Sequence, residues 1–183
     1  AYLKDFGAAT ASNGAVGLYH VENLTPEAKE LGEALVREGA KIYVIDDAEL
    51  ERVKNAYPVM WKKADAAPKL CFVGCPHMSM EQLKDWTVRV EEGLKASGNR
   101  KVLIPTVFTT APGVKKEFDK TEYAARLKAT GVTLSCICPL MYMNNPLCKS
   151  MPVITSSNKL RTYTTARYYT EEEILTKITK EGK

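Results

Sequence analysis

Hydrophobic and polar positions follow two alternating periods along most of this chain. Short β-branched or apolar runs predict strands, and the segments after them place apolar residues three or four positions apart, which is typical of amphipathic helices. The predicted strands are 15–21, 41–45, 69–74, 101–108 and 132–137, with a further short extended run at 151–155. The predicted helices are 25–39, 46–57, 79–98, 115–130, 158–169 and 171–180.

Residues at the ends of these segments support several of the boundaries. Thr25 followed by Pro26 is typical of a helix N-cap and its first residue. Ser79 with Gln82 three residues later predicts a capping box at the start of the longest helix. Pro105 lies inside the fourth predicted strand, so that strand either lies at a sheet edge or has its end close to the proline.

The alternation of strands and helices predicts a three-layer α/β/α fold with a mostly parallel, Rossmann-like sheet of about five strands. We expect residues 1–183 to form a single α/β domain. In open parallel sheets, ligands bind beyond the carboxyl ends of the strands. The loops to inspect are therefore 20–25, 74–79, 105–114, 136–150 and 155–159.

Composition narrows the possible classes of protein. The chain has 183 residues, of which 45% are hydrophobic and 26% charged, and no apolar run is long enough to cross a membrane. The net charge of +4 comes from scattered basic residues, which gives little support to nucleic-acid binding. The first residues lack an initiator Met and the pattern of a signal peptide, so we expect a domain excised from a longer protein.

Five cysteines, an odd number, favour reduced thiols in a cytoplasmic protein over a disulfide framework. Cys75-Pro76-His77 follows the third predicted strand and precedes the helix capped at Ser79. A thiol at a helix N-terminus is shifted towards thiolate, which suits a reactive or ligating cysteine. The alternative is a small buried thiol beside a tight turn. His20 ends the first predicted strand, where it is either a structural residue or part of a site.

A second cysteine motif, Cys136-Ile137-Cys138-Pro139, ends the fifth predicted strand. Cys136 and Cys138 share one face of that strand, and Cys138 is nearer its carboxyl end. Thiolates are the usual ligands of iron–sulfur clusters, and Cys-Pro pairs recur in such loops. The motif lacks the paired C-x₂-C units of a structural zinc site.

Residues 155–159 (Thr-Ser-Ser-Asn-Lys) lie between an extended run and a predicted helix. Hydroxyl, amide and backbone N–H groups at this point suit an anion, and Lys159 adds a full charge. The alternative is a helix cap with a solvated basic face. The sequence contains no dinucleotide fingerprint, P-loop, nucleophile elbow or zincin motif.

Three segments together resemble the aconitase X family. Residues 14–28, with their His and Thr-Pro-Glu-Ala, are similar to one family segment, and Gly74-Cys75-Pro76-His77-Met78-Ser79 is similar to the family's Gly-Cys-Pro-His-x-Ser loop. Ser157-Asn158-Lys159, with Tyr163 downstream, resembles its late Asn/Ser-x-Lys motif. The order and spacing agree across nearly all of the chain.

The resemblance implies an aconitase-superfamily hydro-lyase that dehydrates a small hydroxy acid. Known members act on mevalonate 5-phosphate or cis-3-hydroxy-L-proline, and they use an iron–sulfur cluster held by cysteines. By motif, Cys75 and Cys138 become candidate cluster ligands, and Ser157, Asn158 and Lys159 become candidate substrate-binding residues. His20 and His77 become candidate catalytic residues.

The family's large subunit also has an N-terminal half with another cysteine motif, and a small swivelling domain or subunit completes its site. We expect the chain to need both as partners, and to be inactive and without a cluster by itself. Residues 135–140 differ from the family's Asp-Thr-Cys pattern, which leaves open whether Cys136 or Cys138 is the ligand and which hydroxy acid is the substrate.

Two other functions remain open at this point. The chain could be a non-catalytic α/β binding module that docks a partner through residues 161–169 and keeps its cysteines in the core. It could also be a thiol enzyme that uses Cys75 with His77. Uniformly protected thiols favour the first alternative, and rapid alkylation of Cys75 at neutral pH favours the second.

Overall fold

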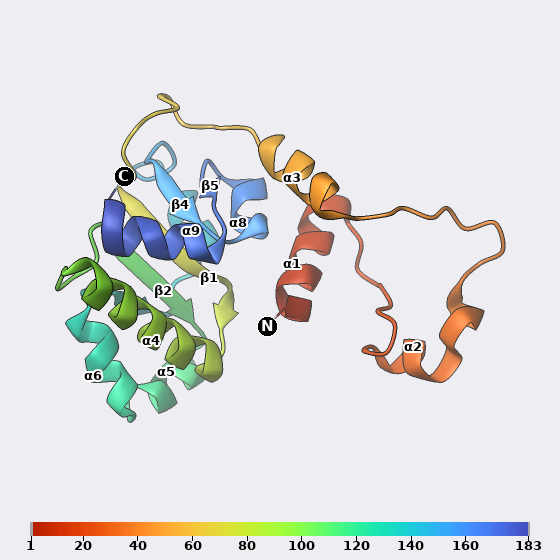
Figure 1. The fold of residues 1–183 in the computed structure, drawn as a ribbon, viewed down its shortest axis with the longest axis horizontal. Helices are drawn as coiled ribbons and strands as arrows, with labels where there is room; N and C mark the ends of the chain where they lie inside the picture. The colour runs from red at the N-terminus through yellow and green to blue at the C-terminus, as the bar shows by residue number, and fades with distance from the viewer. Residues whose placement is uncertain (1, 183) are drawn as a thin grey trace.

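The computed structural model describes residues 2–182 and contains a five-stranded sheet in the order β3-β2-β1-β4-β5 (Figure 1). Every neighbouring pair of strands is parallel. The strands are β1 (Leu70–Met78), β2 (Thr106–Thr110), β3 (Thr133–Ser135), β4 (Val153–Thr155) and β5 (Arg167–Tyr168). The predicted three-layer α/β fold with a mostly parallel sheet is confirmed.

Helices cover both faces of this sheet, and β1 is therefore buried on both sides. Cys71 and Val73 pack with the residues of α4, whereas Leu70 and Phe72 pack with Met143 and with residues of the β4–β5 region. The helices on the α4 side are α4 (Met80–Ser97), α5 (Pro112–Phe118), α6 (Glu122–Ala129) and α9 (Glu171–Thr176), which continues as η2 (Lys177–Glu181). The helices on the other side are α7 (Pro139–Met143), α8 (Asn158–Tyr163) and α1 (Tyr2–Gly14), which packs on α8.

Helix α4 forms as its sequence predicts. The Ser79 side chain accepts a hydrogen bond from the backbone N of Gln82 at 3.2 Å, and the Gln82 side chain accepts one from the backbone N of Ser79 at 3.0 Å. Gly98 ends the helix with a φ of 73°. The predicted apolar face is buried, including Trp86, which meets Phe108 of β2 edge to face.

Two predicted strands near the N-terminus are wrong in this structure. Residues 15–21 and 41–45 have no strand structure, and the connecting elements are α2 (Pro26–Leu31), η1 (Gly32–Leu35) and α3 (Asp47–Asn55). A strand needs a neighbour that pairs with its backbone groups, and no described segment lies beside these residues to do so. Ala28 is the only buried residue among residues 2–55.

Three other predictions are corrected downstream. The single helix predicted for 115–130 is two helices, because the Thr121 hydroxyl donates to the Phe118 carbonyl oxygen at 2.7 Å and ends α5. The helix predicted for 158–169 ends at Tyr163, and the chain then extends into β5.

The fourth predicted strand begins later than expected. Pro105 precedes β2, which starts at Thr106 and lies between β1 and β3, so the edge position is wrong. Proline donates no backbone hydrogen bond, which explains why regular pairing begins after it.

Among the described residues, no helix is long and apolar enough to cross a membrane.

Candidate active site

The candidate site lies where the order of the strands reverses. The chain runs from β1 to β2 and β3 on one side and then returns to place β4 on the other side of β1. Loops that follow β1 and β4 therefore leave the sheet in opposite directions, and a crevice forms between them. The loop predicted for 74–79 is corrected here, because β1 continues past Gly74 to Met78: Cys75 lies in the irregular last part of β1, and the loop after β4 carries Ser157.

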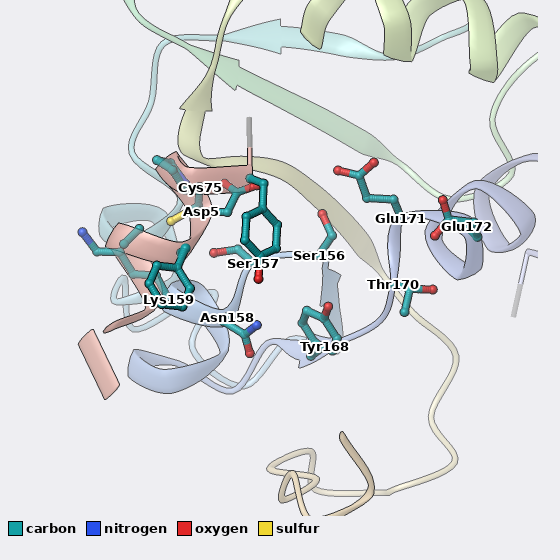
Figure 2. A pocket seen from close by; sticks show the side chains of 15 residues that line it. Asp5, Cys75, Ser156, Ser157, Asn158, Lys159, Tyr168, Thr170, Glu171 and Glu172 are labelled. Atoms are coloured by element: carbon teal, nitrogen blue, oxygen red, sulfur yellow. The ribbon is translucent and has the colours of Figure 1, made fainter. Parts of the chain in front are cut away.

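A cavity of about 470 Å³ occupies this crevice (Figure 2). Its walls are formed by the end of β1, the segment from β4 into α8, the first half of α1, β5 and the start of α9. Its polar and ionisable lining residues are Tyr2, Asp5, Cys75, Ser156, Ser157, Asn158, Lys159, Tyr168, Thr170, Glu171 and Glu172.

Gly74 fixes the direction in which the chain leaves the regular part of β1. The register between β1 and β2 shifts between Val73 and Met78, and Gly74 has a φ of 110°. The Thr109 hydroxyl donates to the Gly74 carbonyl oxygen at 2.6 Å, which holds the two strands together. The Cys75–Pro76 peptide bond that follows is cis. The Cys75 side chain, which follows the turn at Gly74, lies in the cavity wall.

The Cys75 thiol is partly buried among groups that act on its ionisation in opposite directions. Burial raises its pKa, while the hydrogen bond with the Ser157 side chain and the positive charge of Lys159 lower it. The charges of Cys138 and Asp5 raise the pKa of Cys75.

The loop after β4 holds its polar groups in fixed positions. The buried Ser157 hydroxyl accepts a hydrogen bond from the backbone N of Leu160 at 3.0 Å and caps α8. The Tyr57 hydroxyl donates to Asn158 Oδ1 at 2.9 Å, which orients that amide. Among the described residues, no hydrogen bond or ion pair is made by the Lys159 ammonium, whose charge acts on Cys75. These groups can bind an anion beside the thiol.

The structure brings together four of the seven predicted site residues in the cavity wall: Cys75, Ser157, Asn158 and Lys159. Cys138 is exposed at the start of α7 and does not line the cavity. The two histidines do not line the cavity. Their catalytic roles, like the roles of the other site residues, stay predictions.

The positions of the histidines follow from the elements around them. The carbonyl oxygen of His77 accepts a hydrogen bond from Lys4 Nζ at 2.6 Å, so His77 helps to attach α1 to the end of β1. His20 follows α1 in an irregular segment, with its Nδ1 4.0 Å from Glu27 Oε2. The strand that was predicted to carry His20 to the edge of the sheet does not form here.

Sequence reasoning missed the contribution of α1 to the cavity. Asp5 enters the cavity wall from this helix, and its pKa is raised, first by burial. The available signal was the spacing of Tyr2 and Phe6, whose rings stack at 6.1 Å as residues four apart on a helix can. Glu171 also lines the cavity, but Arg89 donates to its carboxylate at 2.8 Å.

The raised pKa of Cys75 predicts slow alkylation. A thiol whose pKa is raised has less thiolate at neutral pH, so Cys75 should react several-fold more slowly with iodoacetamide at pH 7 than the exposed Cys138. Peptide mass spectrometry of the alkylated chain measures both rates, and the fully buried Cys71 serves as the unreactive reference. Faster labelling of Cys75 than of Cys138 would support the thiol-enzyme alternative instead.

Comparison with known protein families adds two matches along the chain. A family model described as the aconitase X second domain matches residues 1–55, and one described as the aconitase X third domain matches residues 68–177. The second match contains both loops that form the cavity, with Cys75 and residues 156–159.

Curated relatives and a solved structure agree with these matches. The phosphomevalonate dehydratase large subunit of Thermococcus kodakarensis is 30% identical over 122 residues, 67% of this chain and 28% of the relative. That of Methanosarcina mazei is 37% identical over 82 residues, 45% of this chain and 18% of the relative. A crystal structure of Thermococcus kodakaraensis aconitase X in its holo-form has a TM-score of 0.70 at 23% identity, covering 97% of this chain and 44% of that one. The chain thus spans less than a third of these curated relatives.

Proposed function

The chain belongs to the aconitase X family, and we propose that it is part of a hydro-lyase that dehydrates a small hydroxy acid. The observation that carries this proposal is the third-domain match over residues 68–177, within which a thiol and an anion-binding loop meet at one cavity. Dehydration of a hydroxy acid requires both a group that assists departure of the hydroxyl and a site for the acid's negative charge. The cavity wall holds candidates for each.

The donor chemistry of Cys75 and Cys138 fits an iron–sulfur cluster. Thiolates are the common ligands of such clusters, and Cys138 is one of the groups that act on the ionisation of Cys75. Among residues 2–182, no group of three or more His, Cys, Asp or Glu side chains is arranged to hold a metal. We therefore propose that Cys75 and Cys138 supply part of the ligand set and that other parts of a longer protein supply the rest. When bound, the cluster would provide a Lewis acid for the leaving hydroxyl.

Lys159, Ser157 and Asn158 would bind the carboxylate or phosphate of the substrate. An ammonium without a paired carboxylate attracts an anion, and the hydroxyl and amide groups add directional hydrogen bonds. The hydroxyl of Ser157 already contacts Cys75, so an anion held by this loop would lie next to the thiol. This arrangement orients the substrate relative to the cluster ligands.

Proton transfer needs a further group in the cavity wall. Asp5 is the carboxyl group best suited to hold a proton there, because burial raises its pKa. The proposed catalytic roles of His20 and His77 would require a rearrangement that brings their side chains to the cavity. A small swivelling domain or subunit, which would close over the cavity and exclude water, is the partner that we propose for this step.

The proposal is tested by the activity of the full-length protein. With mevalonate 5-phosphate or cis-3-hydroxy-L-proline as substrate, we expect dehydration, and we expect Lys159→Met to raise KM about tenfold or more because a charged hydrogen bond is worth about 1.5–3 kcal/mol. The matched control is Lys116→Met, which removes an exposed lysine of α5 far from the cavity. Equal KM values for the two variants would remove Lys159 from the substrate site. No dehydration of any hydroxy acid by the protein with its small subunit would overturn the function itself.

A further inference from the structure

The N-terminal arm, residues 15–55, extends away from the sheet and exposes its apolar side chains. Figure 1 shows the part of this segment around α2 as an orange ribbon that projects away from α1, before the chain returns to α3 beside α1. Ile42 is 92% exposed and Val44 is 73% exposed, and Tyr43 and Ile45 are exposed as well. Earlier in the arm, Leu18, Leu31 and Val36 are also exposed to solvent. The free-energy cost of leaving so many large apolar side chains in water favours a covering surface.

Residues 41–45 have the chemistry of a strand without its partner. Ile42, Val44 and Ile45 are β-branched, and Tyr43 is also common in strands. Among the described residues, no backbone hydrogen bond is made by any residue of 41–45. Unpaired N–H and C=O groups beside exposed apolar side chains are the features of a strand that adds to a sheet edge.

The occupant of this surface follows from how the two family domains divide the chain. Residues 68–177, matched by the third domain, bury a complete core. Residues 1–55, matched by the second domain, bury only Ala28 among those described. The Thermococcus chain whose fold matches 97% of this one has more than half of its own length outside the match. The residues that would cover the arm therefore belong to the second domain rather than to the third.

We propose that residues 41–45 are a strand of a second-domain sheet whose other strands lie in the same polypeptide outside these 183 residues. The strand buries Ile42 and Val44 on one face and Tyr43 and Ile45 on the other, since side chains alternate along a strand. This docking surface does not depend on the chemistry of the cavity or on a bound cluster. With this pairing, the arm connects the second domain to the third.

Hydrogen–deuterium exchange tests the pairing directly. The amides of 41–45 are compared in the 183-residue chain and in the polypeptide extended to the ends of its reading frame. We expect exchange to be about 100-fold slower in the extended polypeptide, because pairing in a core strand protects amides. The amides of α4 serve as the internal reference and keep the same rates in both.

Three outcomes of this comparison overturn the proposal. Equal exchange of 41–45 in both polypeptides means that no strand pairs with them. A reading frame that adds no residues leaves no occupant of the proposed kind. Protection in the 183-residue chain that increases with its concentration identifies a second copy of the chain as the occupant instead.

A pair of variants gives an independent measurement. Val44→Asp places a carboxylate in the proposed buried face, and Arg37→Asp places one on an exposed part of the same arm. Both should leave the melting temperature of the 183-residue chain unchanged. In the extended polypeptide, Val44→Asp should lower the melting temperature by about 5 °C or more, while Arg37→Asp should not. A Val44→Asp effect that is equal in the two polypeptides, or absent from both, contradicts the proposal.

Discussion

Cys75→Ser in the full-length protein is expected to remove the absorbance of the proposed iron–sulfur cluster and to lower the proposed dehydration activity by more than about 100-fold. A serine hydroxyl stays protonated at neutral pH and does not replace a thiolate ligand. Loss of a group that only supports a metal ligand costs about 10–100-fold, so loss of the ligand itself should cost more. Anaerobic reconstitution, followed by visible absorbance and a dehydration assay, measures both effects.

Cys148→Ser is the matched control for this experiment. Cys148 lies between α7 and β4, outside the cavity, and should tolerate the same substitution without loss of absorbance. Cys138→Ser and Cys136→Ser then decide the second ligand, since Cys138 interacts with Cys75 through charge. Full absorbance and activity in Cys75→Ser would refute the assignment of this thiol as a ligand, whatever the other variants do.

Gly74→Ala is expected to destabilise the folded chain by about 2–6 kcal/mol, the sum of backbone strain and overpacking. A Cβ added at Gly74 would lie 2.4 Å from the Thr109 carbonyl oxygen and 2.9 Å from the Thr109 backbone N. Those atoms belong to β2 and cannot move without disturbing its pairing with β1. The φ of 110° is also a conformation that alanine rarely adopts.

Urea denaturation of the 183-residue chain measures this effect, with Gly113→Ala as the control. A Cβ at Gly113 would meet nothing within 4 Å, and the position lies in helix α5, where alanine is favoured. Gly113→Ala should therefore leave stability unchanged or increase it slightly. A Gly74→Ala loss below about 1 kcal/mol would show that the β1–β2 contact relaxes, and that Gly74 does not fix the position of Cys75.

Local sequence signals were sufficient for much of the central fold. Ser79 and Gln82 predicted the start of α4 because a capping box is formed by residues three positions apart. The apolar run that begins at Leu70 predicted β1, because a strand covered on both faces is apolar throughout. The placement of Cys75 and residues 157–159 near the carboxyl ends of strands followed from the alternation of strands and helices, although β1 runs on through Cys75 to Met78 and α8 already begins at Asn158.

The arm shows where local signals and the structure differ. Residues 41–45 have a strand's sequence, but a strand forms only where a neighbour accepts and donates its backbone hydrogen bonds. The described residues offer no such neighbour. The strand predicted for 41–45 is therefore wrong for the described residues, although these residues have the preferences of a strand, and that difference is the basis of the pairing proposed above.

By itself, the sequence determined the α/β class and its long helix, and it selected Cys75 and residues 157–159 as candidates, because these features depend on residues close together in the chain. Only the tertiary structure decided that these two segments share a cavity, since that depends on β4 lying beside β1. It also placed Asp5 in the wall and left both histidines outside it. Contacts between segments far apart in the chain are set by strand order and helix docking, which no local pattern of residues encodes.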